Sequence, residues 1–414
     1  MTAAVRLGLR ANATQFSLLV ALNALVGGMV GLERSVLPLV GRDEFALVST
    51  SAILAFVVAF GAAKAVTNLA AGALAERVGR KRLLAAGWML ALPIPLLIAL
   101  AQSWWWIVAA NVLLGVNQGL TWSMTILMKI DLAGPRRRGL ALGLNESIGY
   151  LGVAVAAFAT GALAASYAPR TVVWVGAVLL VAGGLVVTLT FVHDTAEHVR
   201  LETGADAGAA APFGSAFTAT TFRDPVLRAC SQAGLVNNLN DAVAWGLAPL
   251  YLAAHGASLR EIGIIAAAYP LVWGVGQLAT GWLSDITGRK PLISTGMFVQ
   301  AGALALLVGG DGSFAPALAA ALLLGVGTAM VYPALLAAVS DTVRPQARAN
   351  AVGVYRFWRD FGFVAGAVIA GLGADATSAS TAVAIVAAVT GVSGLVVAAT
   401  PWNARAALHP QPAK

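Results

Sequence analysis

The sequence contains few residues of the kinds that build metal or disulfide sites. Among its 414 residues are one cysteine, Cys230, four histidines and seven methionines. A single cysteine excludes a disulfide framework, and so few sulfur and imidazole ligands argue against a soft-metal site. We therefore expect no metal and no cofactor, and we interpret Cys230 as a packing residue.

Charged residues are also scarce. They make up 11% of the chain, against about 25% in an average soluble domain, whereas 59% of the residues are hydrophobic. The net charge of +8 would suit nucleic acid, but the basic residues lie in short segments between apolar runs and form no single patch. The composition favours a protein of the lipid bilayer and no nucleic-acid binding.

Long apolar runs fill most of the chain. Each is close to the roughly 20 residues that cross about 30 Å of hydrocarbon as a helix. The first run, Phe16 to Leu32, is too long for a signal peptide and is interpreted as an uncleaved helix. The predicted fold class is an all-α membrane protein with twelve transmembrane helices, at residues 14–34, 48–71, 83–102, 104–129, 139–166, 171–192, 228–254, 260–283, 291–309, 314–340, 348–374 and 379–400.

Lysine and arginine are distributed unequally between the two sides of this arrangement. Most of them lie on the side that carries both chain termini. Because positively charged loops stay in the cytoplasm, we expect a multi-pass protein of the cytoplasmic (inner) membrane with both termini cytoplasmic. The opposite side has only Arg34, Arg42, Arg170 and Arg260.

A polar segment rich in alanine and glycine separates the sixth and seventh predicted helices. It predicts three parts: an N-terminal six-helix bundle at 1–192, a cytoplasmic linker at 193–227 and a C-terminal six-helix bundle at 228–414. No clear oligomerisation motif is present, so we expect a monomer.

The two halves repeat two loop motifs. Gly72, Leu74, Glu76, Gly79, Arg80 and Lys81 reappear, 209 residues further on, as Gly281, Leu283, Asp285, Gly288, Arg289 and Lys290. Asp131, Pro135 and Arg138 reappear, 210 residues further on, as Asp341, Pro345 and Arg348. Two motifs at nearly one offset indicate an ancestral duplication, with the halves related by a pseudo-twofold axis along the membrane normal.

The first repeated motif resembles the signature loop of the major facilitator superfamily, in which a glycine and an acidic residue precede Gly-Arg-Lys or Gly-Arg-Arg between helices two and three. The match occurs twice, and the topology is similar to that of twelve-helix bacterial members over essentially the whole chain. The resemblance implies a secondary transporter whose helices one, four, seven and ten line a central cavity. Glu76 departs from the aspartate that is most common in the family.

We interpret the repeated loops as a conformational latch. Glycines allow a tight turn, while the acidic residues can lie against helix N-termini and the arginines can pair with carboxylates. Such contacts can form in one conformation and break in the other. The alternative is that the basic residues only set the topology. The latch residues are Gly72, Glu76, Gly79, Arg80, Asp285, Gly288 and Arg289.

Ionisable residues at membrane depth are costly and therefore mark candidate functional positions. Seven lie within the predicted helices: Glu33, Lys64, Glu146, Asp241, Arg356, Arg359 and Asp360.

Asp241 lies about 20 Å into helix seven, near the midplane of the bilayer. Spacings of three and four residues place Asn237, Asn238 and Asp241 on one helix face, with Trp245 one turn further on. Amides, a carboxylate and an indole suit a binding wall for a partly polar organic molecule. The alternative is a structural cluster that lets the helix bend near Gly246.

Glu146 in helix five is a candidate proton carrier, because a partly desolvated carboxyl can change charge near neutral pH. The repeat places Glu146 opposite Arg356, and the alternative is a permanent salt bridge between them. We expect proton coupling at Asp241, Glu146 and Asp360.

Helix eleven carries three of the seven charges. Arg356 and Asp360, four residues apart, are expected to pair on one helix face, which would leave Arg359 as the less compensated cation. Lys64, Arg356 and Arg359 would then bind an anion together, or alternatively neutralise the buried carboxylates.

Helix four presents Asn111, Gln118 and Trp122 on one face, at spacings that make a polar stripe along the expected cavity. Tyr332 in helix ten is a further candidate for substrate binding.

These features favour secondary active transport of a small organic solute by alternating access, coupled to protons, with export by antiport favoured over uptake. The alternatives are proton-coupled uptake or exchange of an anionic metabolite and, third, metal-ion export. The helix-four arginine and the Gly-Pro-rich helix-five motif usual in drug exporters are missing from this chain.

An enzyme would need a nucleophile with its base, or clustered metal ligands, at membrane depth. The histidines lie outside the predicted helices, so we expect no catalytic activity. They are His193, His198, His255 and His409.

Overall fold

The structure is a computed structural model that describes residues 8–133, 138–198, 213–343 and 345–402. Within these ranges every regular element is a helix, as expected for a chain that must satisfy its backbone hydrogen bonds inside a bilayer.

The N-terminal half contains the six predicted helices, three of them broken into two pieces. The breaks occur where prolines enter the sequence, before Pro38 and at Pro93, or where a short turn precedes the main helix. The pieces are α1 (Ala13–Arg34) with α2 (Leu37–Asp43), α3 (Thr50–Ile53) with α4 (Ala55–Val78), α5 (Arg80–Ala91) with α6 (Pro93–Ala99), α7 (Trp104–Ala133), α8 (Arg138–Ala164) and α9 (Pro169–Thr190).

In the C-terminal half, the seventh predicted helix is interrupted by a π-helical turn at the place where the sequence suggested a bend. The elements are α11 (Phe213–Thr218), the π-helical segments η2 (Ala219–Arg223) and η3 (Val243–Leu247), α12 (Pro225–Ala242), α13 (Ala248–Ala254), α14 (Leu259–Thr287), α15 (Arg289–Gly309), α16 (Phe314–Thr342), α17 (Pro345–Ala376) and α18 (Ala379–Ala399).

Nine of the described helical segments are long and apolar enough to cross a membrane. The other three predicted spans contain α4, α7 and the broken helix α12–α13. The described stretch of α4, Ala55–Ala71, is apolar but shorter than the others. In α7 and in α12–α13 the mean hydropathy is lowered by amides such as Asn111 and Asn237, which are buried between helices. Polar residues that face the protein interior rather than lipid are compatible with a spanning helix. The twelve-helix, two-bundle architecture predicted from the sequence is confirmed.

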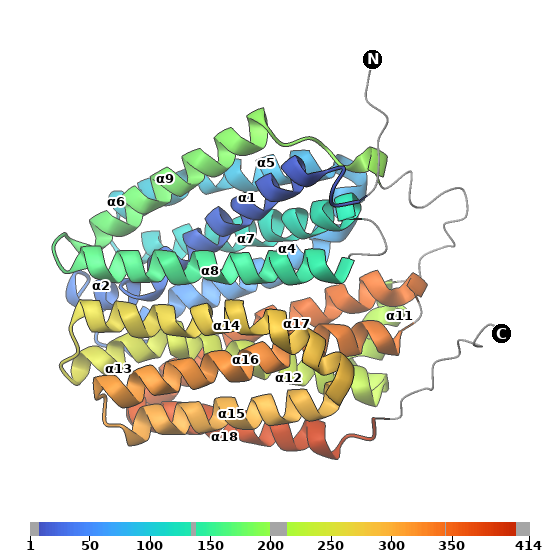
Figure 1. Ribbon diagram of the computed structural model, residues 1–414. Coiled ribbons are helices and arrows are strands. Elements are labelled where there is room, and N and C mark those ends of the chain that lie inside the picture. Colours follow the sequence, from blue (N-terminus) through green and yellow to red (C-terminus); the bar gives the residue numbers. More distant parts are fainter. Residues whose placement is uncertain (1–7, 134–137, 199–212, 344, 403–414) are drawn as a thin grey trace.

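The two halves form two bundles packed side by side (Figure 1). Helices α1 to α9, in blue to green, make one bundle, and α12 to α18, in yellow-green to red, make the other. The halves contact each other mainly through α8 with α14 and α4 with α17. The start of α1, the end of α18 and α11 lie at one end of the molecule (Figure 1). We call this the motif end, because the turns at Gly79 and Gly288 also lie there, and the opposite one the far end.

At the far end the halves are joined closely. Asp375 of α17 accepts hydrogen bonds from the hydroxyls of Ser49 and Ser51, at 2.7 and 2.5 Å, and from the backbone N–H of Ser51 at 3.0 Å. Gly161 of α8 lies directly against Gly263 of α14, where a Cβ on either residue would come within 2.8 Å of the other's backbone. Small residues let the two helices approach, so the far end is closed in this conformation.

The repeated loops form the same turn in both halves. Gly79 and Gly288 have φ of +93° and +87°, a region in which L-residues with a side chain are strained. The arginine after each glycine pairs with the aspartate of the second repeated motif. Arg80 Nε lies 2.6 Å from Asp131, and Arg289 Nε lies 3.3 Å from Asp341.

Asp285 pairs at 2.6 Å with Arg289, the first residue of α15. The N-cap Gly288 of α15 receives no side-chain hydrogen bond, and the predicted role of Asp285 at a helix N-terminus stays a prediction. At α5, Asp194 from the segment after α9 accepts from the backbone N–H of Lys81 at 2.9 Å. The side chain of Glu76 and the surroundings of Gly72 lie outside the described part of the structure.

The domain boundaries stay predictions. Helix α9 ends at Thr190 and α12 begins at Pro225, close to the predicted limits of the linker. Residues 199–212 lie outside the described residues.

Replacing Gly288 with alanine should destabilise the protein by about 1–3 kcal/mol, because alanine must adopt a backbone conformation that is rare for L-residues. Thermal unfolding of the purified protein in detergent measures this. Gly302 in the middle of α15 is the matched control, since its Cβ would meet no atom within 4 Å and alanine there should be neutral or stabilising by up to about 1 kcal/mol. Equal effects of the two substitutions would contradict the strained turn.

Candidate functional site

A hydrogen-bonded group of charged residues joins the two halves at mid-depth. Glu146 of α8 accepts a hydrogen bond from Trp122 Nε1 of α7 at 2.8 Å and from the Tyr332 hydroxyl of α16 at 3.0 Å. The Tyr332 hydroxyl in turn accepts from Arg359 of α17 at 2.5 Å. One carboxylate of the N-terminal half is thus bonded directly to the C-terminal half.

Asp360 is the second centre of this group. Its carboxylate lies 3.0 Å from Arg359 and 3.8 Å from Lys64 of α4, and it accepts from the amides of Asn68 and Asn238. The three charged residues of this cluster, Lys64, Arg359 and Asp360, are each at most 7% exposed. Two cations around one buried carboxylate leave a net positive charge that the nearby Glu146 offsets.

The predicted pairing along α17 is wrong. Arg359, not Arg356, holds Asp360, because the Asp360 carboxylate lies toward α4 and Lys64. Arg356 is half-buried, and no described residue accepts a hydrogen bond from its buried Nε. A direct salt bridge between Glu146 and Arg356 is likewise not formed between the described residues, since Trp122 and Tyr332 take the carboxylate.

The polar residues predicted on one face of helix seven, Asn237, Asn238 and Asp241, lie in two different environments. Asn237 accepts from Gln300 of α15 at 3.0 Å, inside the C-terminal bundle. Asn238 lies toward Asp360, and Asp241 accepts from the hydroxyl of Tyr269. Side chains three and four residues apart on a helix point in directions that differ by tens of degrees. Asn237 therefore points into the C-terminal bundle, while Asn238 and Asp241 lie nearer the centre.

The stripe of helix four is also divided. Asn111 donates to Glu33 at 3.4 Å and Gln118 donates to the Val26 carbonyl at 2.9 Å, both on α1. These two amides therefore fill the contact between α7 and α1, and only Trp122 of the stripe reaches the group between the halves.

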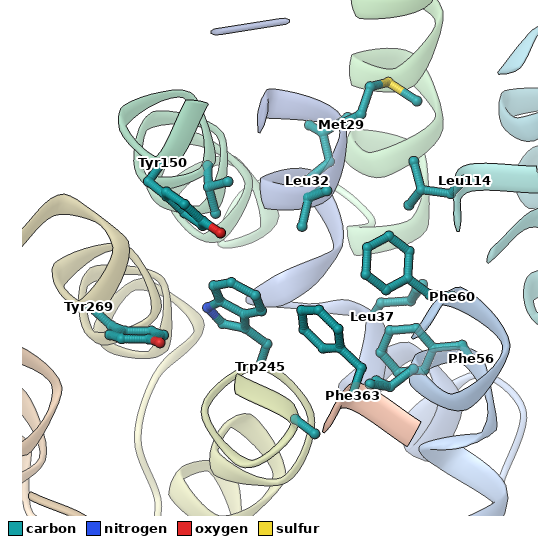
Figure 2. Close-up of a cluster of buried hydrophobic side chains, with 14 of the residues drawn as sticks. Met29, Leu32, Leu37, Phe56, Phe60, Leu114, Tyr150, Trp245, Tyr269 and Phe363 are labelled. Atoms are coloured by element: carbon teal, nitrogen blue, oxygen red, sulfur yellow. The ribbon is translucent and has the colours of Figure 1, made fainter. Parts of the chain in front are cut away.

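Aromatic rings continue from this group toward the far end. Tyr150 of α8 stacks on Trp273 of α14 with ring centroids 3.4 Å apart, and Tyr269 lies 5.7 Å from Trp273. Trp245 follows at 5.6 Å from Tyr269. Figure 2 shows Trp245 between Tyr150, Tyr269 and the ring of Phe363. The centre of the protein is therefore lined by rings contributed by both halves.

A cavity of about 450 Å³ opens between the halves on the motif side of Glu146. Its wall includes Glu146 of α8, Tyr332 of α16 and Gln277 of α14, and it extends to Asp285 and Arg289 at the repeated loop. Because this cavity reaches the repeated loop while the far end is closed, the structure is open toward the motif end. This volume suits a small organic molecule.

The sequence reasoning missed two buried cations. Lys129 is fully buried and donates to the Leu19 carbonyl at 3.2 Å, because α7 extends to Ala133 and so places Lys129 inside the helix. Arg34 was counted as an outer loop residue, but it is fully buried because the span continues into α2. The sequence did indicate this, because the apolar run continues past Arg34 through the residues around Pro38.

The Major Facilitator Superfamily profile matches residues 16–237 and 230–414, which together cover nearly the whole chain. The chain belongs to the major facilitator superfamily. The two overlapping matches divide between the halves, as expected for a transporter built from a repeat.

Curated relatives support the same family. An uncharacterized MFS-type transporter of Mycobacterium tuberculosis is 30% identical over 260 residues, 60% of this chain and 60% of that protein. The inner membrane transport protein YajR of Escherichia coli is 37% identical over 101 residues, 24% of this chain and 22% of that protein. The 3-(3-hydroxy-phenyl)propionate transporter of the same organism is 37% identical over 111 residues, 27% of each chain. The chain thus aligns with about 60% or less of the length of these relatives.

Solved structures share the fold over most of the chain. The nucleoside transporter NupG has a TM-score of 0.71 at 16% identity, covering 92% of this chain and 99% of its own. The human organic anion transporter MFSD10 has a TM-score of 0.69 at 16% identity, with 93% and 99% covered. A bacterial homolog of the human lysosomal transporter Spinster, solved inward-facing, has a TM-score of 0.68 at 15% identity, with 94% and 95% covered.

Replacing Asp360 with asparagine should destabilise this transporter by about 3–5 kcal/mol, because Lys64 and Arg359 are left buried without their carboxylate. The measurement is thermal unfolding in detergent. The double variant Lys64→Gln with Asp360→Asn should recover part of the loss. Asp43→Asn, which removes an exposed partner of Arg42, is the control and should change stability by no more than about 0.5 kcal/mol. An Asp360→Asn variant as stable as this control would contradict the buried ion group.

Proposed function

We propose that this chain is a proton-coupled secondary active transporter of a small organic solute that works by alternating access. We place it in the cytoplasmic membrane as a monomer, with the motif end and both termini on the cytoplasmic side. The excess of lysine and arginine on that side supports this orientation.

The observation that carries the proposal is the position of Glu146. Its carboxylate belongs to the N-terminal half, is bonded to Tyr332 of the C-terminal half and lines the open cavity. A proton arriving through the cavity therefore reaches a group that bonds the two halves. When Glu146 is ionised, it accepts from Tyr332 as a charge-assisted hydrogen bond, and protonation removes the charge and weakens that bond.

A change in the charge of Glu146 also affects the other charged residues between the halves. Tyr332 also accepts from Arg359, which holds Asp360 and thereby Lys64 of the opposite half. Protonating Glu146 lowers the negative charge available to these cations. Because the preferred packing of the halves depends on these bonds, protonation biases the equilibrium between the two open states. Asp241 and Asp360 are the further proton-coupling residues of the proposal.

The solute site lies along the aromatic and amide wall. We assign it to Trp122, Asn238, Asp241, Trp245 and Tyr332, which come from both halves. The paired arginines of the repeated loops act as the latch, since Arg80 and Arg289 pair within their own halves while the motif end is open.

The relatives agree with the solute class. The transporters named above carry, by their names, a hydroxyphenylpropionate, nucleosides or organic anions. Export remains the expected direction. Uptake of an anionic metabolite is a second candidate, favoured by the buried guanidinium of Arg34, from which no described residue accepts a hydrogen bond.

Glu146→Gln should abolish the response of transport to a pH gradient while retaining exchange driven by the solute gradient. The assay follows a panel of organic solutes in proteoliposomes with an imposed pH gradient and records which solute moves and in which direction. Glu44→Gln is the matched control, because Glu44 pairs with Arg170 at the far end and is partly exposed. Asp241→Asn is tested in parallel. If Glu146→Gln and Asp241→Asn both kept full proton-driven accumulation, the coupling assignment would fail. Loss of all exchange in Glu146→Gln would indicate a purely structural role.

A further inference from the structure

Arg34 is a buried cation whose guanidinium nitrogens have no hydrogen-bond acceptor among the residues that the structure describes. It ends α1 and is 0% exposed. None of its three guanidinium nitrogens donates to a described residue. Its neighbour Glu33 instead accepts from Asn111 at 3.4 Å, because successive residues on a helix point about 100° apart.

The surroundings of Arg34 come from both halves. Its guanidinium carbon lies 4.8 Å from the ring centroid of Phe60 in α4 and 5.1 Å from that of Trp245 in η3. Phe363 of α17 packs on both rings, at 5.4 and 6.2 Å, and Figure 2 shows these three rings together. Arg34 therefore lies at the seam between the halves, on the path that must open when the far end opens.

A second donor beside Arg34 is also unused. No described residue accepts from Trp245 Nε1, which is buried. Aromatic faces stabilise a desolvated guanidinium by only about 2 kcal/mol, whereas buried donors in native proteins almost always have an acceptor. The Arg34 guanidinium and Trp245 Nε1 are thus neighbouring donors for which the described residues supply no acceptor. A ligand with oxygen acceptors would satisfy both.

We propose that Arg34 binds the carboxylate of the transported solute, and that the substrate class is an organic monocarboxylate with a ring-sized apolar body. The planar guanidinium matches a carboxylate through two parallel hydrogen bonds. Trp245 Nε1 supplies a further donor, and Trp245 and Tyr269 provide the faces against which the apolar body packs. This inference rests on the proposed transport function and holds for either direction of transport.

The rival explanation is that Arg34 only balances the buried carboxylates of Glu33 and Asp241, the two acidic groups whose charges act on it. Asp241 also accepts a hydrogen bond from Tyr269. A structural counter-charge would stabilise the protein without distinguishing an acid from its neutral amide. The two explanations therefore differ in ligand selectivity.

The experiment measures binding of 3-phenylpropanoate and of 3-phenylpropanamide to the purified full-length protein by titration calorimetry. The wild type should bind the acid at least about tenfold more tightly than the amide, since hydrogen bonds to a charged group contribute about 1.5–3 kcal/mol. Arg34→Gln should remove this preference while leaving the amide affinity unchanged. Arg42→Gln, an exposed arginine on α2 paired with Asp43, should behave as the wild type.

Arg34→Lys keeps the inference testable if Arg34→Gln does not fold. Lysine retains the charge but not the planar pair of donors, so it should weaken acid binding more than amide binding. A wild type that binds neither probe, or binds both equally, overturns the proposal. So does an Arg34 variant that weakens both probes alike.

The outcome is separable from that of the proposed function. If Arg34→Gln left proton-driven flux of the carboxylic acid unchanged, the carboxylate assignment would fail and proton coupling would stand. If acid binding required Arg34 but Glu146→Gln left proton-driven flux intact, the coupling assignment alone would fail.

Discussion

The cost of removing charge from water is the constraint on which the centre of this protein depends. A buried ion costs several kcal/mol unless an opposite charge and hydrogen bonds compensate it. Lys64, Arg359 and Asp360 meet this requirement only as a group, and Glu146 completes it through Tyr332. Because the partners belong to different halves, the halves cannot separate here without exchanging charged partners.

The same constraint connects stability to conformational change. Each half is a helical bundle whose backbone is satisfied internally, so each can move as a body. Closely packed residues such as Gly161 and Gly263 hold the far end, while the cavity beside Glu146 leaves the motif end open. Between them lies the ion group. In the proposed mechanism, one proton on Glu146 shifts the equilibrium between two packings of the halves that differ by a few kcal/mol.

The fold was predictable because its signals are local. Apolar runs and repeated loops are read directly from the sequence, and the repeat also identified Asp131 and Asp341, which pair with Arg80 and Arg289. Partners across the interface were not predictable in this way. Spacing along α17 favoured Arg356 with Asp360, but a carboxylate pairs with whichever cation the opposite helices bring to it, and that was Lys64 and Arg359. Arg34 was wrongly placed in an outer loop, because the first membrane span continues past it from α1 into α2.

The most direct test of the role of Glu146 is the distance between the two halves at the motif end as a function of pH. Spin labels at Val78→Cys and Ile286→Cys, in a Cys230→Ala background, lie on α4 and α14, at the motif-end termini of helices of opposite halves. Acidification should change the distance distribution of the wild type, and Glu146→Gln should fix the low-pH distribution at every pH. A Glu146→Gln variant that keeps the full pH response would contradict the central role of Glu146.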